Sequence, residues 1–318
     1  MTTMFSTPVS VTNIEQLTPL IKAFTFERTD GLAFSPFSAG SHVVVSMGEG
    51  HDSHKNPYSL VGHSEDLKQY RIAIRHEANG RGGSTFMHEQ IEVGSQLEIG
   101  SPYNLFPLHW LARKHLFIAG GVGITPFMAY IKDMKMMHKN FELHYAIRNK
   151  KNGAFVDELL RDNSGKIFIY SNEKHEPLDI SRLLDKQPLG THVYVCGPHQ
   201  MVEDVLRLSE QLGWPQSAVH SEEFTAPDPG KSFTVKLARS DRKIHVSERE
   251  SLLEALERSG LDIPYSCRGG ACGFCKTEVI SGTPEHRDYY LSDEEKSSNK
   301  CMMPCISRAK NDDLTLDL

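Results

Sequence analysis

Four cysteines near the end of the chain constrain its fold more than any other feature. Cys267, Cys272, Cys275 and Cys305 have the spacing C-x4-C-x2-C-x29-C, which places four thiolates where one loop can wrap a small metal cluster. Proteins hold [2Fe-2S] clusters with this spacing. The residues between the first two cysteines are small and rich in glycine, which suits a loop whose backbone amides hydrogen-bond sulfur.

Two alternatives concern the metal and the fourth ligand. Structural zinc sites usually pair two short Cys-x2-4-Cys knuckles, whereas here three cysteines lie together and the fourth stands alone. We therefore favour iron–sulfur over zinc. Cys301 is the rival fourth ligand, but its separation from Cys275 is four residues shorter than that of Cys305 and departs from the plant-type spacing. We predict that Cys301 does not bind the cluster.

The segment that precedes these cysteines resembles plant-type ferredoxin. A capping box, formed either by Ser247 with Glu250 or by Ser251 with Glu254, opens a predicted helix with an apolar face. Gly260 suits the end of this helix. The chain then runs directly into the cysteine loop. The resemblance implies a C-terminal β-grasp ferredoxin domain.

Composition limits the class of protein. At 318 residues and 39% hydrophobic content, the chain has room for two or three domains with proper cores. A net charge of -6 without a basic run argues against nucleic acid as a partner. No signal peptide is visible, and reduced thiolates fit a reducing compartment, so we expect a cytoplasmic protein. The weakly polar run 116–131 is shorter than the ~20 residues of a membrane span, so we expect no membrane partner.

The chain has three regions with different sequence patterns. These patterns predict a multidomain α/β and β protein. Residues 1–110 contain short strand-like runs between glycine-rich turns, which suits a flavin-binding antiparallel β-barrel. Residues 111–225 alternate apolar strands with helix-like segments, as in a parallel α/β nicotinamide-binding domain. The run 226–230 contains two prolines and a glycine and is the predicted linker. Residues 231–318 are the predicted ferredoxin domain.

A flavin motif lies in the first region. Residues 56–60, Asn-Pro-Tyr-Ser-Leu, resemble the Arg-x-Tyr-Ser-Leu element of the ferredoxin reductase-like flavoproteins, in which tyrosine and serine line the flavin. Asn56 replaces the arginine and offers no charge to the flavin phosphate. The turn 80–84 can supply backbone amides and the charge of Arg81, although such a turn can also be an ordinary hairpin. By this resemblance the flavin residues are Asn56, Tyr58, Ser59, Ile74, Arg75, Arg81, Gly82, Gly83, Ser84 and Phe224.

Two further motifs lie in the second region. Residues 119–126 follow an apolar strand and lead into a predicted helix, so that a pyrophosphate can lie across the helix N-terminus. Their spacing alone is a weak signal, but they resemble the Gly-Gly-x-Gly-x-Thr-Pro element of the same flavoproteins. Residues 196–198 resemble the Cys-Gly-Pro element that ends the last strand beside the nicotinamide. The resulting nicotinamide residues are Gly120, Gly121, Gly123, Thr125, Pro126, Arg148, Cys196, Gly197 and Pro198.

Two arguments about the choice between NADH and NADPH point in opposite directions. Arg148, Lys150 and Lys151 follow the second strand of the α/β region and could pair with a 2′-phosphate, which favours NADPH. The same residues are common in exposed loops, and the family resemblance described next favours NADH, which we predict. No residue is assigned a catalytic role, and the 16 histidines are taken as solvated or structural.

The order flavin barrel, nicotinamide domain and ferredoxin resembles the phthalate dioxygenase reductase family across essentially the whole chain. This resemblance implies an NADH-dependent oxidoreductase that contains FMN and passes electrons through a [2Fe-2S] cluster to a Rieske-type oxygenase. A flavin is required because nicotinamide gives two electrons and the cluster accepts one. Within the family, we expect the reductase of a carnitine or related quaternary-amine monooxygenase, because the Asn-Pro-Tyr-Ser-Leu variant is similar to that of those chains.

Other functions stay open at this point. Vanillate demethylase reductases, or reductases of other aromatic-acid oxygenases, are the nearest alternative within the family. A stand-alone NADH diaphorase would need no protein partner. A nonenzymatic electron carrier is disfavoured, because a carrier needs neither the 119–126 motif nor the 196–198 motif.

Overall fold

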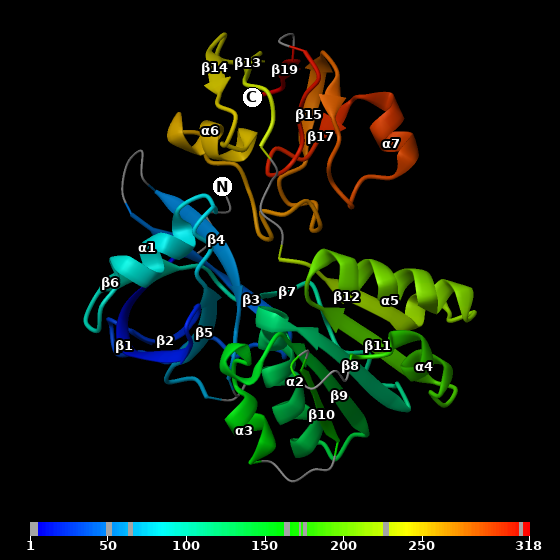
Figure 1. Cartoon of the computed structure of the whole chain (residues 1–318). Helices are drawn as coiled ribbons and strands as arrows, with labels where there is room; N and C mark the ends of the chain where they lie inside the picture. The colour runs from blue at the N-terminus through cyan, green and yellow to red at the C-terminus, as the bar shows by residue number, and fades with distance from the viewer. Residues whose placement is uncertain are drawn as a thin grey trace.

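The chain forms three lobes, each built around its own sheet (Figure 1). The computed structural model describes residues 6–48, 53–62, 66–161, 166–171, 173, 177–224, 229–311 and 314–318. Residues 226–228 of the predicted linker, and residue 225 before it, lie outside this set. Within the described ranges, no helix is long and apolar enough to span a bilayer.

The N-terminal lobe is an antiparallel barrel. Its elements are β1 (Thr7–Thr18), β2 (Ile21–Arg28), β3 (Ser41–Met47), β4 (His54–Ser59), β5 (Tyr70–Arg75), α1 (Gly83–Glu89), β6 (Gln96–Ile99) and β7 (Tyr103–Asn104). The strand order is β4-β3-β6-β1-β2-β5, and β7 pairs with β3. An antiparallel bridge between Leu60 and Ile72 joins the end of β4 to β5. This bridge connects the two ends of the strand order, as in a closed barrel.

The middle lobe is a parallel sheet with helices on both faces. Its strands are β8 (Lys114–Gly120), β9 (Phe141–Ile147), β10 (Ile167–Ser171), β11 (Thr191–Cys196) and β12 (Val219–Glu222). Its helices are η2 (Gly121–Ile124), α2 (Thr125–Met136), η3 (Lys150–Asn152), α3 (Val156–Leu160), α4 (Ile180–Asp185), α5 (His199–Gln211) and η5 (Gln216–Ala218). Residues of α2 and α3 share one hydrophobic core, and residues of α4 and α5 share another.

The order of strands in the middle sheet fixes where a ligand can bind. The order is β10-β9-β8-β11-β12, so the chain runs outward from β8 in one direction and then outward from β11 in the other. In open α/β sheets, the carboxyl ends of two such neighbouring strands form the ligand crevice. The 119–126 and 196–198 motifs lie at the ends of β8 and β11, directly at this crevice.

The C-terminal lobe has the ferredoxin architecture. Its elements are β13 (Phe233–Leu237), β14 (Lys243–Val246), α6 (Leu252–Arg258), β15 (Thr277–Ser281), β16 (Pro284–Glu285), α7 (Asp293–Ser298), β17 (Cys301–Met302), β18 (Arg308–Ala309) and β19 (Leu314–Leu316). The sheet order is β14-β13-β19-β15-β17, and β16 pairs with β18. Ser251 and Glu254 form the capping box of α6, which settles the choice left open by the sequence. The predicted fold class is confirmed in all three lobes.

Candidate functional site

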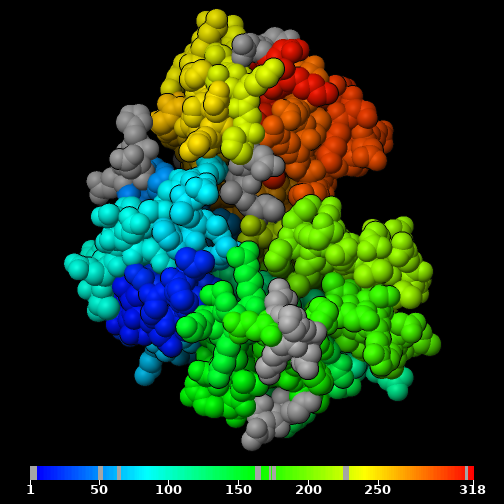
Figure 2. Space-filling model, viewed as in Figure 1, coloured from blue at the N-terminus to red at the C-terminus, as the bar shows by residue number. Residues whose placement is uncertain are grey.

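A cavity of about 720 Å³ lies where the three lobes meet. Figure 2 shows the C-terminal lobe, yellow to red, resting against the cyan part of the barrel. Nine of the ten predicted flavin residues line the cavity, Gly82 being the exception. Cys267 and Cys305 line it from the C-terminal lobe, and Thr125 lines it from the first turn of α2. One cavity therefore joins the flavin motif, the nicotinamide motif and the cysteine loop.

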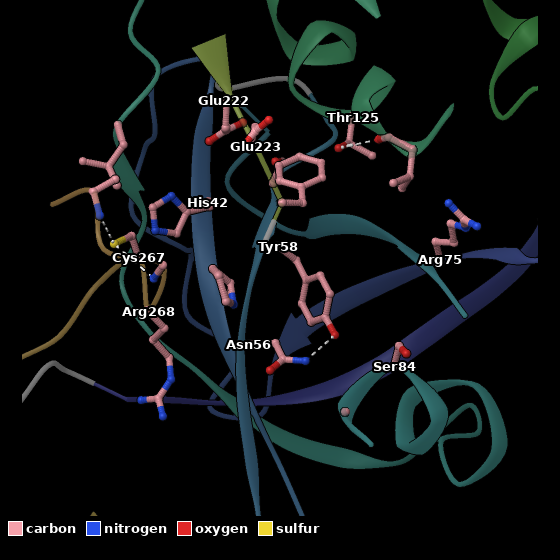
Figure 3. A pocket seen from close by; sticks show the side chains of 18 of the residues that line it. His42, Asn56, Tyr58, Arg75, Ser84, Thr125, Glu222, Glu223, Cys267 and Arg268 are labelled. Carbon is pink, nitrogen blue, oxygen red and sulfur yellow. Dashed lines mark hydrogen bonds between the residues drawn. The ribbon is translucent and has the colours of Figure 1, made fainter. Parts of the chain in front are cut away.

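The barrel wall of the cavity is built from the flavin motif and the 80–84 turn (Figure 3). Asn56 Nδ2 donates to Tyr58 Oη at 3.1 Å, and burial raises the pKa of Tyr58 to about 12. A Cβ atom placed on Gly83 would lie 2.4 Å from Asn56 Nδ2, so the turn packs directly on this side chain. Gly82 has φ +101°, a conformation that glycine adopts without strain. The glycines thus let the turn's backbone amides approach the cavity closely.

His42 is a cavity residue that sequence reasoning missed. Its side chain is buried at 5% exposure, and burial lowers its pKa to about 4, so it is neutral at pH 7. It pairs in register with Ser59 across β3 and β4. Neither His42 Nε2 nor Ser59 Oγ has a hydrogen-bond partner among the described residues. Buried polar atoms normally have partners, so this wall fits a polar ligand such as a flavin ring.

The nicotinamide motifs pack closely against each other. A Cβ on Gly123 would lie 2.2 Å from Cys196 O, and one on Gly120 would lie 2.5 Å from Pro198 Cδ. Pro126 occupies the first turn of α2, where its missing N–H costs little. The structure thus brings the two motifs together at the sheet crevice.

The cysteine loop gathers the four predicted ligands. Cys267 Sγ accepts hydrogen bonds from the amides of Gly269 and Ala271, each at 3.4 Å. The neighbouring Cys272 thiol lowers the pKa of Cys267 to about 5, and Cys275 raises the pKa of Cys305. The thiols therefore interact as two pairs, and backbone amides point at sulfur. This donor set fits a [2Fe-2S] cluster.

Cys301 lies apart from these pairs. It sits in β17, where it pairs with Glu278 of β15. Burial raises its pKa, and the charges that act on it belong to Lys276, Glu295 and Asp288 rather than to other cysteines. This placement agrees with its exclusion from the predicted ligands.

Comparison with known proteins places the chain in a family. Residues 235–310 match the model of the 2Fe-2S iron-sulfur cluster binding domain. Residues 98–219 match the model of the dimethylamine monooxygenase subunit DmmA-like, N-terminal domain. The structure resembles that of phthalate dioxygenase reductase with a TM-score of 0.86 and 32% identity, covering 98% of each chain. The chain belongs to the phthalate dioxygenase reductase family.

Two curated relatives extend over the same length. A carnitine monooxygenase reductase subunit of Acinetobacter baumannii is 44% identical over 313 residues, 98% of each chain. The beta subunit of a heme-dependent oxidative N-demethylase of Ectopseudomonas mendocina is 43% identical over 310 residues, again 98% of each chain. As a member of the phthalate dioxygenase reductase family, the chain is an NAD(P)H-dependent flavin and iron–sulfur oxidoreductase, which confirms the predicted enzyme class.

Within this phthalate dioxygenase reductase fold, Arg81 has partners that the sequence did not indicate. It lines the cavity, but its Nε donates to the carbonyl of Arg249 at 3.0 Å and its Nη2 donates to Glu254 of α6. Arg75, the other predicted flavin cation, pairs with Glu77 at 3.0 Å. Ser84 Oγ accepts from the amide of Glu77 at 3.1 Å. The ferredoxin lobe therefore fixes the orientation of Arg81.

Glu222 is a second cavity residue that sequence reasoning missed. In its segment, only the aromatic residue Phe224 is predicted as a site residue. Glu222 pairs in register with Cys196 and lines the cavity. Burial raises its pKa to about 8, and its Oε2 has no hydrogen-bond partner among the described residues. A carboxyl group that is mostly protonated at neutral pH thus lies beside the nicotinamide motifs. Phe224 follows at the cavity wall and is half exposed.

Arg148 is not brought into this site. It is exposed just beyond the end of β9 and does not line the cavity. Lys150 and Lys151 form part of η3 and are likewise exposed. These side chains do not contact the cavity, so their part in coenzyme choice stays a prediction.

Proposed function

We propose that the chain is the NADH-oxidising reductase component of a two-component oxygenase. In this proposal, electrons pass from NADH through FMN to a [2Fe-2S] cluster and then to the oxygenase. The observation that carries it is the single cavity lined by Tyr58, Thr125 and Cys267, one residue from each lobe. When bound, the flavin supplies the link between a two-electron donor and a one-electron acceptor.

The chain's own residues position the reactants. Tyr58, Ser59 and His42 line the barrel wall and would hold the flavin ring there. The packed glycines at the ends of β8 and β11 would let the nicotinamide approach that ring, and Phe224 lines the cavity where it would cover the ring when the coenzyme is absent. Glu222 holds a proton beside this position, because burial favours its neutral form. Cys267 and Cys305 line the same cavity and would hold the cluster there, beside the flavin.

We propose that the flavin is FMN rather than FAD. The 80–84 turn and the start of α6, at Ser251, Leu253 and Glu254, line the same cavity, and Arg81 of the turn pairs with Glu254. This packing of α6 beside the turn supports a flavin that ends at its phosphate. Acid release of the cofactor followed by chromatography should yield FMN. Recovery of stoichiometric FAD would refute this assignment.

Two kinds of oxygenase are candidate partners. Similarity to the carnitine monooxygenase reductase subunit favours a Rieske-type oxygenase that acts on carnitine or a related quaternary amine. A haem-dependent N-demethylase is the second candidate, because its beta subunit is almost as similar and residues 98–219 match a dimethylamine monooxygenase subunit model. Both candidates require the same flow of electrons out of the ferredoxin lobe.

Reconstitution with purified oxygenase components distinguishes these partners. The chain is mixed with NADH and either a carnitine oxygenase component or the alpha component of a haem-dependent N-demethylase, and substrate loss is measured against NADH consumed. The Cys305→Ser variant is the control, because it should lose electron delivery but keep flavin reduction. Coupled turnover with the carnitine component supports the first candidate. Reduction of dyes alone, with neither oxygenase active, would support a stand-alone diaphorase.

A further inference from the structure

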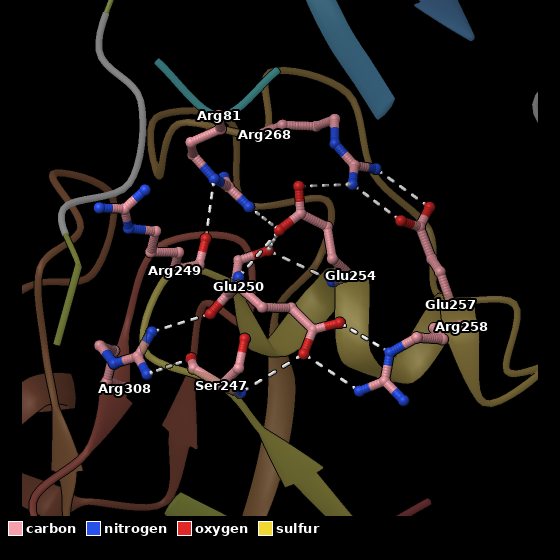
Figure 4. Close-up of polar contacts among 10 residues, drawn as sticks. Arg81, Ser247, Arg249, Glu250, Glu254, Glu257, Arg258, Arg268 and Arg308 are labelled. Atoms are coloured by element: carbon pink, nitrogen blue, oxygen red, sulfur yellow. Dashed lines mark hydrogen bonds and ion pairs between the residues drawn. The ribbon is translucent and has the colours of Figure 1, made fainter. Parts of the chain in front are cut away.

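Five charged side chains of alternating sign join the barrel to the cysteine loop. Figure 4 shows four of them, Arg81, Glu254, Arg268 and Glu257. Lys55 Nζ lies 3.0 Å from Glu257 Oε1, and Arg268 binds both oxygens of Glu257 at 3.0 and 2.7 Å. Arg268 also lies 3.9 Å from Glu254, which in turn pairs with Arg81. We call this set, Lys55, Glu257, Arg268, Glu254 and Arg81, the charged seam. It runs from the barrel through α6 to the cysteine loop and back to the barrel.

The seam is shielded from water at its centre. Arg268 is only 7% exposed, and the side chains of Glu257 and Glu254 are 17% and 25% exposed. Opposite charges lower the pKa of both carboxyl groups despite their burial, so both stay ionised at pH 7. Partly buried pairs are screened less by salt than exposed pairs, and losing one partner leaves its neighbour poorly compensated.

Arg268 connects the charged seam to the predicted cluster ligands. It directly follows Cys267 and adopts a left-handed backbone conformation with φ +51°. Its guanidinium lies 4.6 Å from the centre of the Tyr265 ring, and Lys55 Nζ from the barrel lies 5.1 Å from the same ring. The backbone next to the first ligand is therefore held by contacts that reach across to the barrel.

We propose that the charged seam seats the ferredoxin lobe on the barrel in the arrangement that lets the flavin reduce the cluster. Lys55 is a positioning residue for this electron transfer. It directly precedes Asn56 and lines the cavity, and its ammonium group pairs with Glu257 and lies over Tyr265, so it anchors the loop that carries Cys267 to the barrel. The inference rests on the proposed function, since it assigns a role within the electron path from flavin to cluster.

The test measures the two electron-transfer steps separately in the full-length protein loaded with flavin and cluster. Lys55→Gln removes the charge at the seam, and Lys55→Glu places a negative charge opposite Glu257. Arg239→Glu is the matched control, because Arg239 forms an exposed ion pair with Asp317 elsewhere on the ferredoxin lobe. Anaerobic stopped-flow mixing with NADH follows flavin bleaching and cluster bleaching, and small-angle scattering reports the radius of gyration.

Flavin reduction by NADH should stay within about twofold of wild type in all three variants. Cluster reduction should slow by roughly fivefold in Lys55→Gln and by more than about tenfold in Lys55→Glu, and be unchanged in Arg239→Glu. The radius of gyration should rise in Lys55→Glu. Raising ionic strength from about 0.1 M to about 1 M shortens screening from about 10 Å to about 3 Å. Cluster reduction should then slow in wild type but accelerate in Lys55→Glu, where salt screens repulsion.

Three outcomes would overturn the inference. Wild-type cluster reduction in Lys55→Glu, with flavin and cluster both retained, would show that the seam does not govern the step, while leaving the proposed function intact. Loss of flavin or cluster from both Lys55 variants would place Lys55 in cofactor retention instead. A wild-type protein that binds no flavin would overturn the proposed function and the inference together.

Discussion

Among alanine substitutions of the glycines in the sequence motifs, Gly123→Ala should impair the nicotinamide site most. Gly123 lies in η2 after β8, and an added Cβ would lie 2.2 Å from Cys196 O and 2.5 Å from Cys196 C. Both atoms belong to the backbone at the end of β11, so no side chain can rotate away. The ends of β8 and β11 must move apart by roughly 1 Å to restore van der Waals contact.

That displacement sets the expected size of the effect. The crevice between the two strand ends is where we place the nicotinamide, and a 1 Å misplacement of a reacting group can cost about 10²-fold in rate. Flavin reduction by NADH, followed by anaerobic stopped flow, should therefore slow by about 10²-fold in Gly123→Ala. Flavin content and cluster content should be unchanged, because neither the barrel nor the ferredoxin lobe contains the clash.

Gly213→Ala is the control for a glycine-to-alanine change that produces no clash. Gly213 has φ +74° and no atom within 4 Å of an added Cβ, so this variant tests the cost of a left-handed alanine without a clash. It should lose about 1–2 kcal/mol of stability and keep its rate of flavin reduction. If Gly123→Ala reduces its flavin within about fivefold of the wild-type rate, the close packing of the two motifs does not position the nicotinamide.

Two further predictions concern the cluster and Glu222. Cys305→Ser should lose the cluster, measured as bound iron, yet keep NADH-driven flavin reduction, whereas Cys301→Ser should keep both; iron loss in the latter would reassign the fourth ligand. The pKa of Glu222 rises from 4.5 to about 8 on folding, so its stabilising effect is full below pH 4.5 and is lost as pH rises through 8. In cofactor-free protein, urea unfolding should show this loss, at most about 5 kcal/mol. A wild-type pH profile as flat as that of Glu222→Gln would contradict it.

Structural features that depend on residues close together in the sequence could be predicted. The cysteine spacing predicted the loop because three of the four ligands lie on one short, glycine-rich segment. The motifs 119–126 and 196–198 could be placed at one edge of a sheet because each follows an apolar strand, and carboxyl ends of parallel strands share an edge. The helix start at Ser251 was one of two capping-box readings, and the burial of Leu252 and Leu253 fits that register.

Contacts between distant residues could not be predicted. Arg81 is 173 residues from Glu254 and Lys55 is 202 residues from Glu257, so no local pattern links them. The sequence therefore assigned Arg81 to the flavin alone and gave Lys55 no role. The perturbed pKa of Glu222 likewise depends on its burial in the folded chain, which a run of four residues such as Ser-Glu-Glu-Phe cannot reveal.

An anaerobic titration with NADH tests the central claim most directly, namely that one chain carries electrons from nicotinamide through flavin to the cluster. Flavin accepts two electrons, the cluster accepts one, and each NADH gives two. The absorbance of both groups should therefore be fully bleached at about 1.5 equivalents of NADH per chain, with the paramagnetic signal of a reduced cluster. Bleaching that ends at about one equivalent, with the flavin reduced and the cluster still oxidised, would contradict the account.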